Sequence, residues 1–345
     1  MFRHEMSQRS GSPRYHFWIL VLLGVGCIPV SLGFLVSHQQ SREKISTGSK
    51  LKVSVSSEEI RMRLITQLEK LREKDRQAKS VSKDDLVIVW EDDSLVVVDK
   101  PSGVLSVASE EGIPSLAQCV FENTRNSFSS HDRMVVHRLG TETSGLIVFA
   151  KTMEALRGMN SLFRTRQILR QYEVLVCGHV QDDKGTIDMP LMRDYIHPPY
   201  MRVSTDEHQK ALLTLDPAIV GKKLLEAPKP SQTHFEVVSR ETFQNSDLPV
   251  TRLRVTSITG RTHQINVHCA AFGHPIVGDR VYGLSGEAAP FGGMEDGPRM
   301  HADLDLQNAI AAVDKDMNMC VHATHLQFAH PVTNQHLDFN SPAPF

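Results

Sequence analysis

The chain has 345 residues, of which 40% are hydrophobic and 23% charged, and its formal net charge is −2. This composition is that of a folded globular protein and excludes a disordered or collagen-like chain. A nucleic-acid site would therefore depend on a local basic patch rather than on the overall charge. The five cysteines are odd in number, far apart and without a CxxC pair. This pattern argues against a disulfide framework and a zinc site, and it favours a reducing compartment for the folded part.

Residues 17–36 form an uncharged, mostly apolar run that follows three arginines. About 20 apolar residues suffice to cross a bilayer. The run predicts a membrane anchor, or a cleaved signal such as the first half of a sequence targeting an organelle like a plastid or mitochondrion; a buried core helix is the third interpretation. Basic residues on both sides leave the orientation open. We therefore assign residues 1–50 to a targeting or transmembrane segment and linker.

Residues 51–85 are expected to hold an amphipathic helix and a second linker. Ser56 and Glu59 have the spacing of a capping box. An apolar stripe follows at near-helical spacing: Ile60, Leu64, Leu68 and Leu71. The opposite face is charged, which indicates a solvated helix packed on the domain, with partner or RNA binding as the alternative.

From residue 86 onward short β-branched runs dominate. Residues 86–90 and 95–98 flank an acidic turn and predict a hairpin that ends before Pro101. Further β segments are expected at 135–151, 172–177, 233–239 and 251–257, helices at 153–166 and 304–313, and a strand followed by a short helix that ends at 270–272. Many short strands and few helices predict an α+β domain at 86–345, with a central mixed or antiparallel sheet flanked by helices and loops. Residues 197–230 and 284–318 look like insertions.

Four segments, in this order, resemble the RluA-type pseudouridine synthases. They are VWEDDSLVVVDKPSG at 89–103, HRLGTETSGL at 137–146, RQY at 170–172, and TGRTHQINVH at 259–268, which continues into GHPIVGD at 273–279. Residues 321–323 and 328–332 are similar to that family's closing strands. The resemblance implies the pseudouridine synthase fold for residues 86–345.

The resemblance also implies an activity: isomerisation of uridine to pseudouridine in tRNA or rRNA, by a monomer and without a cofactor. Such chemistry requires the target nucleotide to be flipped out of its stack. The family's essential aspartate follows His-Arg-Leu and acts as nucleophile or base. An arginine after Gly-Arg-Thr-His-Gln-Ile pairs with it, and a tyrosine two residues after a basic residue packs against the base.

Two of these positions differ in this chain. Gly140 occupies the aspartate position and has no side chain, and Asn266 occupies the arginine position and is neutral. The two losses are physically linked, because a buried arginine without its carboxylate would be strongly unfavourable. Tyr172 and the basic Arg170 remain. Glu142, two residues after Gly140, is a possible substitute carboxylate, although a surface or hydrogen-bonding role is the competing interpretation; Asp132 and Asp279 are more remote candidates.

The expected RNA-binding residues are Arg138, Lys100, Arg261, His263 and Arg170. Arg138 would hold the RNA backbone or help to flip the base, with a structural ion pair as the alternative. Arg261 and His263 could instead order the strand and loop around the pocket. The scattered histidines fit no closed zinc pattern, so we expect no metal. Three functions stay open: a working synthase, a catalytically silent RNA-binding protein, and a membrane-tethered scaffold that binds protein.

Overall fold

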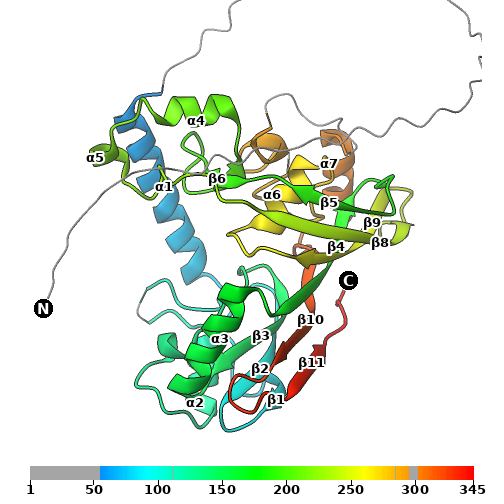
Figure 1. The fold of residues 1–345 in the computed structure, drawn as a ribbon. Helices are drawn as coiled ribbons and strands as arrows, with labels where there is room; N and C mark the ends of the chain where they lie inside the picture. The colour runs from blue at the N-terminus through cyan, green and yellow to red at the C-terminus, as the bar shows by residue number, and fades with distance from the viewer. Residues whose placement is uncertain (1–54, 111, 284, 295–301) are drawn as a thin grey trace, which may run out of the picture. The chain divides into compact units, whose positions relative to one another are not determined.

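The computed structural model describes residues 55–110, 112–283, 285–294 and 302–345 (Figure 1). The apolar run at 17–36 and its linker lie outside the described residues. Contacts group residues Val53–Phe345 into one compact unit. Among the described residues, no helix is both long and apolar enough to cross a bilayer.

A nine-stranded sheet forms the centre of this unit, with the order β1-β2-β3-β10-β4-β9-β8-β5 and with β11 paired to β10. Its strands are β1 (Val87–Glu91), β2 (Leu95–Lys100), β3 (Ser144–Ala150), β4 (Leu169–Cys177), β5 (Lys184–Asp188), β8 (Gln232–Thr242), β9 (Pro249–Ser257), β10 (Val321–Ala329) and β11 (His336–Asn340). The β3–β10 pair is parallel and the other pairs are antiparallel. The expected α+β architecture with a mixed, mostly antiparallel sheet is confirmed.

Helices and a small second sheet surround the large one. The helices are α1 (Ser57–Arg76), α2 (Leu116–Asn123), α3 (Met153–Thr165), α4 (Asp206–Leu212), α5 (Pro217–Val220), α6 (Gln264–Ala271) and α7 (Leu304–Val313), with 3-10 turns η1 (His131–Met134) and η2 (Pro290–Gly293). The second sheet pairs β6 (Leu191–Arg193) with β7 (Met201–Val203).

Strand β2 is a continuous apolar run because both faces of the sheet are covered at this point. Val96 and Val98 join the core that contains α2, whereas Leu95 and Val97 join the core that contains α3. The two helices therefore lie on opposite faces of β2 and β3. The hairpin of β1 and β2 predicted from the acidic turn is confirmed.

The short helix expected to end at 270–272 is confirmed as α6, which begins at Gln264. The sequence interpretation was wrong at three other places. Of the β region expected at 135–151, only residues 144–150 form a named strand, β3. Residues 321–329 form one strand, and the chain turns at 330–335 before β11. Helix α2 was not expected, because its eight residues are too short for periodicity to separate them from a buried strand.

Helix α1 begins where the capping pattern predicts, and Ser56 Oγ accepts a hydrogen bond from Glu59 N at 3.2 Å. Ile60 is fully buried among Leu215, Val220 and Leu224 of the expected insertion. Leu68, however, is 37% exposed, because Gln67 and not Leu68 faces the rest of the protein at this turn of the helix. The helix thus packs on the insertion by its first turns and is solvated over much of its length.

Candidate functional site

A buried lysine holds the loop at residues 137–143. Lys100, at the end of β2, is fully buried, and its Nζ donates to Val104 O at 2.7 Å, Thr141 O at 2.9 Å and Pro101 O at 3.0 Å. Burial lowers the pKa of Lys100 to about 7, against the opposing effect of the Glu142 charge. The expectation that Lys100 binds RNA phosphate is therefore corrected: its three donors face backbone carbonyls inside the protein.

Serine hydroxyls and backbone groups secure the rest of this loop. Ser106 Oγ donates to Leu139 O at 2.8 Å and accepts from Leu139 N at 3.2 Å. Ser102 Oγ donates to Glu142 O at 2.7 Å. Arg138, between these anchors, is exposed and has no hydrogen bond or ion pair with any residue that the structure describes. The loop is held in place, but the Arg138 side chain remains available to a ligand.

The backbone at Gly140 does not require a glycine. Its φ lies outside the left-handed region, and an added Cβ would meet Thr143 Oγ1 at 3.4 Å, an ordinary van der Waals distance. Gly140 is exposed, and its carbonyl accepts from Thr143 N at 3.1 Å. Position 140 therefore has room for the Cβ atom that the glycine lacks.

A buried polar chain secures the start of β3, directly after the loop. Ser341 Oγ donates to Asp99 and accepts from His322 Nε2 at 2.9 Å, so His322 Nδ1 is left to accept from Ser144 Oγ at 2.8 Å. Burial lowers the pKa of His322, which keeps its ring neutral. This chain runs from the Ser144 hydroxyl through the His322 ring and the Ser341 hydroxyl to the Asp99 carboxylate, and it joins β3, β10, the C-terminal segment and β2. Ser144 is 6% exposed, so its hydroxyl is not an accessible nucleophile.

Strand β4 places Tyr172 beside this loop. Tyr172 is 8% exposed and packs in the same core as Leu139 and Ile265. Its hydroxyl makes no hydrogen bond with the residues described. The loop, β4 and α6 thus meet at one core, and the Tyr172 hydroxyl is uncommitted.

Arg170 lies two residues earlier on β4, against α3. Its guanidinium carbon is 5.5 Å from the centre of the Phe163 ring, and Nη2 donates to Ser257 O at 3.5 Å. Its buried Nε has no hydrogen-bond partner among the residues that the structure describes. Burial, with the Arg170 charge second, lowers the pKa of His137 to about 3. His137 is neutral and uses Nε2 to accept from Val148 N at 3.1 Å, which is a structural role.

Asn266 on α6 is engaged with a carboxylate. Its Nδ2 donates to Asp279 Oδ2 at 2.7 Å, and Met319 Sδ lies 3.1 Å away. Asp279 Oδ1 accepts from the backbone N–H groups of Val281 and Tyr282, each at 2.9 Å. The carboxylate has three donors, so Asp279 is a fixed structural acceptor and Asn266 supplies one of its bonds.

His263 precedes α6 in the left-handed conformation, with φ of 52°. Tyr282 Oη accepts from Met201 N at 3.2 Å and lies 2.8 Å from His263 Nδ1, which is the one acceptor for the buried hydroxyl proton among the described residues. When Nδ1 accepts this proton, the proton of the neutral ring lies on Nε2. Desolvation lowers the pKa of His263, although the nearby Asp279 charge opposes it. His263 is thus a neutral imidazole whose Nε2–H is its remaining donor.

Arg261 in the same turn ties α6 to the insertion, because its Nε and Nη2 each donate to Pro230 O at 3.3 Å. Glu142 turns toward α1, where its Oε1 lies 3.2 Å from Lys74 Nζ. Asp132 is exposed on η1. Neither Glu142 nor Asp279 therefore has an uncommitted carboxylate that could replace the aspartate missing at position 140.

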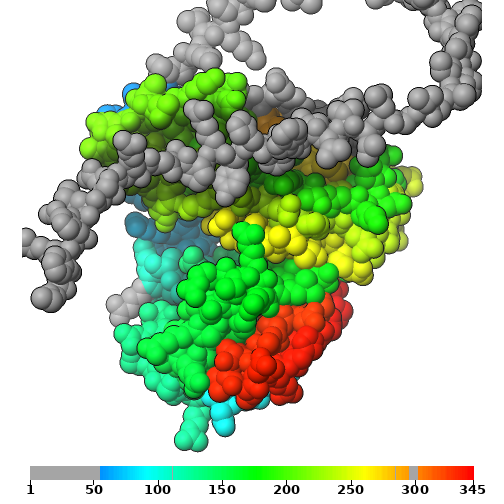
Figure 2. All heavy atoms as spheres, in the orientation of Figure 1, coloured from blue at the N-terminus to red at the C-terminus, as the bar shows by residue number. Residues whose placement is uncertain are grey.

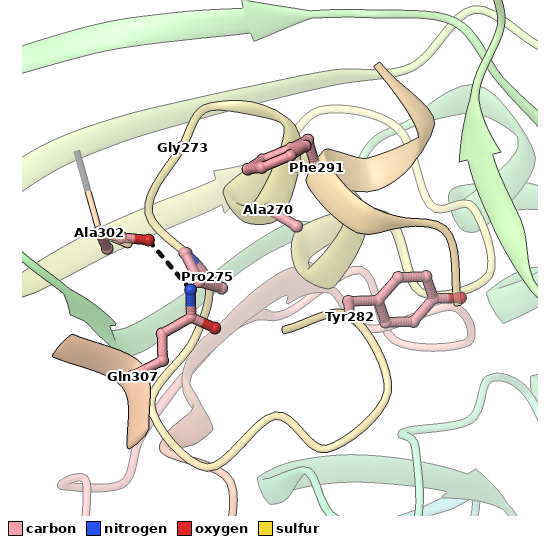
Figure 3. Close-up of a pocket in the computed structure, with 7 residues that line it drawn as sticks. All are labelled: Ala270, Gly273, Pro275, Tyr282, Phe291, Ala302 and Gln307. Carbon is pink, nitrogen blue, oxygen red and sulfur yellow. Dashed lines mark hydrogen bonds between the residues drawn. The ribbon is translucent and has the colours of Figure 1, made fainter. Parts of the chain in front are cut away.

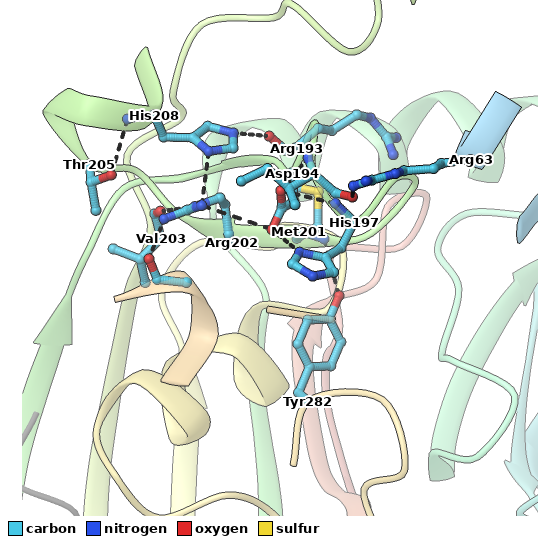
Figure 4. A network of polar contacts seen from close by, with 12 residues as sticks. Arg63, Arg193, Asp194, His197, Met201, Arg202, Val203, Thr205, His208 and Tyr282 are labelled. Carbon is cyan, nitrogen blue, oxygen red and sulfur yellow. Dashed lines mark hydrogen bonds and ion pairs between the residues drawn. The ribbon is translucent and has the colours of Figure 1, made fainter. Parts of the chain in front are cut away.

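A buried polar network that sequence reasoning missed supports this region (Figure 4). Arg202 Nη1 lies 2.8 Å from His208 Nδ1 and 4.0 Å from Asp194 Oδ2, and all three residues are buried. Burial, and next the Arg202 charge, lowers the pKa of His208 to about 4. No local pattern marks these residues, because they are brought together by the β6–β7 turn and α4.

Neither of two cavities in the described part of the chain is lined by Gly140, Tyr172 or Asn266. The one in Figure 3 lies between α6 and α7 and has a volume of about 10 Å³, and two of its lining residues are joined by a bond from Gln307 Nε2 to Ala302 O at 3.0 Å. The other is an open hollow of about 530 Å³ on β4, β5, β8 and β9, lined by Lys184, His234, Glu236 and Arg254 among others. Within the described ranges, no group of three or more His, Cys, Asp or Glu side chains could hold a metal ion.

Comparison with known proteins gives consistent matches. The sequence profile of the family described as RNA pseudouridylate synthase matches residues 94–271. The "Dual-specificity RNA pseudouridine synthase RluA" of Pasteurella multocida is 32% identical over 260 residues, which are 75% of this chain and 94% of the relative. The Escherichia coli protein of that name has the same identity and coverage. Human RNA Pseudouridylate Synthase Domain Containing 1 superposes with a TM-score of 0.53 at 24% identity, covering 77% of this chain and 87% of that one.

Proposed function

Because this chain belongs to the RNA pseudouridylate synthase family, we propose that it binds uridine-containing RNA at the site around Gly140, Tyr172 and Asn266 without isomerising the uridine. The observation that carries the proposal is Gly140 itself: the loop around it is anchored and has room for a Cβ atom at this position, yet it supplies no carboxylate. Attack on the ribose, or removal of a proton from it, needs such a group close by.

The groups that we propose to contact RNA are side chains whose polar atoms still have hydrogen-bonding capacity within the described part of the chain. Arg138 is exposed on the loop, the Tyr172 hydroxyl makes no hydrogen bond within the described part of the chain, and His263 offers Nε2–H. The Nε of Arg170 lacks a hydrogen-bond partner among the described residues, and the Arg170 charge acts on His137 of the same loop. Two cations and neutral donors of this kind suit an RNA phosphate and a flipped base. We propose tRNA or rRNA as the ligand.

Isomerisation remains a second candidate because Glu142 lies only two residues from Gly140. Its ion pair with Lys74 joins side chains that are 35% and 54% exposed, and such pairs contribute only about 0–1 kcal/mol. The pair can therefore open at little cost, and Glu142 would then be the carboxylate. Pseudouridine formation breaks the bond between uracil N1 and ribose C1′ and forms one between C5 and C1′. The hydrogen at C5 is released to water, and N1 takes up a proton in its place.

One experiment separates the two functions. The full-length chain is incubated with tRNA and rRNA transcripts carrying uridine tritiated at C5, and tritium release and RNA binding are measured in parallel. We expect binding that weakens as salt rises, without release. Release that Glu142→Gln abolishes would establish the enzyme instead, and absence of binding to every transcript would exclude RNA as the ligand.

A double variant tests whether the missing carboxylate at position 140 is what prevents isomerisation. In Gly140→Asp with Asn266→Arg, the family's charged pair is restored on the same scaffold. Tritium release gained by this variant alone would show that only the pair was missing. Release from the unmodified chain and the double variant alike would contradict the proposal.

We also propose that residues 17–36 anchor the chain in a membrane or target it to an organelle, and that the folded part acts as a monomer in a reducing compartment. The support is the length of the uncharged run and the absence of paired cysteine spacing. Extraction of membranes with alkaline carbonate tests the anchor, since deletion of residues 17–36 should release the chain. Analytical ultracentrifugation tests the monomer.

A further inference from the structure

Helix α1 connects two parts of the folded unit that both border the site (Figure 1). At its first turns, Ile60 packs into the insertion and Arg63 Nη1 donates to Ile196 O at 3.1 Å. Near its end, Lys74 Nζ lies 3.2 Å from Glu142 Oε1 in the loop that contains Gly140. In Figure 2 the blue helix is visible between the green segments above and the cyan segments below. The helix thus reaches from the insertion to the Gly140 loop.

The middle of α1 contacts the groups that support α6. Gln67 Nε2 donates to Tyr200 Oη at 2.8 Å, and it also bonds Glu287. The Tyr200 ring packs edge-on against Tyr282, at 6.1 Å between centres, and Tyr282 holds His263. One side of α1 therefore runs from the His263 end of the site to the Gly140 end.

Lys70 lies on this side of the helix. Seven residues after Arg63 and four before Lys74, it falls on the same face as both, since an α-helix repeats every 3.6 residues. Arg63 and Lys74 are bound to the two anchors, whereas Lys70 between them is exposed and has no hydrogen bond or ion pair with the residues that the structure describes. An unpaired ammonium group therefore lies along the site.

We propose that α1 forms one wall of the RNA site and that Lys70, with Lys74, binds backbone phosphates of the RNA whose uridine lies near Gly140. This inference rests on the proposed function and adds to it an RNA-contact element outside the family-like residues 86–345. A protein with a net charge of −2 must gather its phosphate contacts locally. Lys74 can exchange the half-exposed Glu142 for a phosphate at small cost.

Arg61 provides a matched control on the same helix. It is also exposed and without a hydrogen bond or ion pair within the described part of the chain. Nine residues separate it from Lys70, which is two and a half turns, so the two side chains point in opposite directions. Lys70→Glu and Arg61→Glu change the net charge equally and remove no contact. They differ in the side of α1 on which the charge changes and in its place along the helix.

The test measures the affinity of the full-length chain and both variants for a fluorescently labelled RNA hairpin with uridines in its loop, at several salt concentrations. We expect Lys70→Glu to weaken binding by about tenfold at low salt and to reduce the slope of log affinity against log salt by about one. Arg61→Glu should change affinity by less than about twofold, and Lys70→Arg should retain it.

The experiment distinguishes a wrong role for α1 from a wrong proposed function. If the unmodified chain binds and Lys70→Glu binds equally well, or both charge reversals weaken binding alike, α1 is not the wall of the site and the proposed function stands. If the unmodified chain shows no salt-dependent binding to the hairpin or to the tRNA and rRNA transcripts, the proposed function fails and this inference fails with it. Far-ultraviolet circular dichroism of each variant checks that α1 is still folded.

Discussion

Two glycines of the same motif have different physical reasons to be there. Gly145 has φ of 106°, and an added Cβ would lie 2.4 Å from Ala323 O, where β3 meets β10. Gly140 has neither constraint. Backbone geometry therefore accounts for Gly145, but nothing in the local structure requires Gly140, and the missing side chain at 140 concerns chemistry rather than folding.

This contrast predicts opposite effects of one substitution. Gly140→Ala should leave the free energy of unfolding unchanged or raise it by about 0.4–1 kcal/mol, because alanine restricts the unfolded chain. Gly145→Ala should lower it by about 2 kcal/mol or more, since it combines a left-handed alanine with a backbone clash. Urea unfolding of both variants measures the difference, and equal destabilisation would refute the assignment for Gly140.

Among the other site residues, some roles followed from the sequence and some did not. The loss of the carboxylate and of its partner is visible in the motif letters alone. The destination of each remaining polar side chain is not, because it depends on which distant segment folds against it. Lys100 and Glu142 illustrate this, as both lie in family-like segments but bond to carbonyls of another loop or to α1.

Elements whose apolar spacing is regular were predicted well, and short or mixed ones were not. Helix α3 and the strands β4, β8 and β9 lie close to their expected ranges. The end of helix α6 was expected at 270–272, but its start was not, because the helix is buried on nearly all sides between β8 and η2 and so shows little helical periodicity. Asn266 is consequently on a helix and points to Asp279.

The stability with which helix α1 docks on the domain depends on a small cluster outside the main core. Ile60→Ala should destabilise its docking by about 2–5 kcal/mol, because Ile60 is fully buried in the small cluster with α5. Hydrogen exchange should then accelerate in α1 while β2 and β3 stay protected. Ile65, 39% exposed on the same helix, is the control, and Ile65→Ala should have little effect. Unchanged protection in α1 after Ile60→Ala would mean that other contacts hold it.

At the scale of the whole molecule, buried neutral histidines make stability depend on pH. Burial lowers the pKa of His137 to about 3 and that of His208 to about 4, from 6.5 in the unfolded chain. Below pH 6.5 the unfolded chain therefore binds protons that the folded protein does not. Stability is full above 6.5 and falls as the pH drops toward these lowered values, by about 1.4 kcal/mol per pH unit for each fully contributing histidine.

Replacing one histidine should reduce this dependence. In His137→Gln the amide oxygen can still accept from Val148 N, but the group no longer titrates. We expect the free energy of unfolding to fall less steeply between about pH 6.5 and about pH 4. The slope should be smaller by up to about 1.4 kcal/mol per pH unit, which corresponds to one proton. Urea unfolding at several pH values measures it. A slope identical to that of the unmodified protein would show that His137 is protonated in the folded state.

The amino-acid sequence by itself determined the family, the order of the motifs, the first hairpin, the N-terminal cap of α1 and the absence of a carboxylate at residue 140. These depend on local patterns or on residue identity. Only the tertiary structure decided that Lys100 is internal, that Asn266 bonds Asp279, and that α1 joins the insertion to the Gly140 loop. The reason is that partners such as Lys74 and Glu142 are far apart in the chain, and burial and pairing between them arise only when the sheet has brought their segments together.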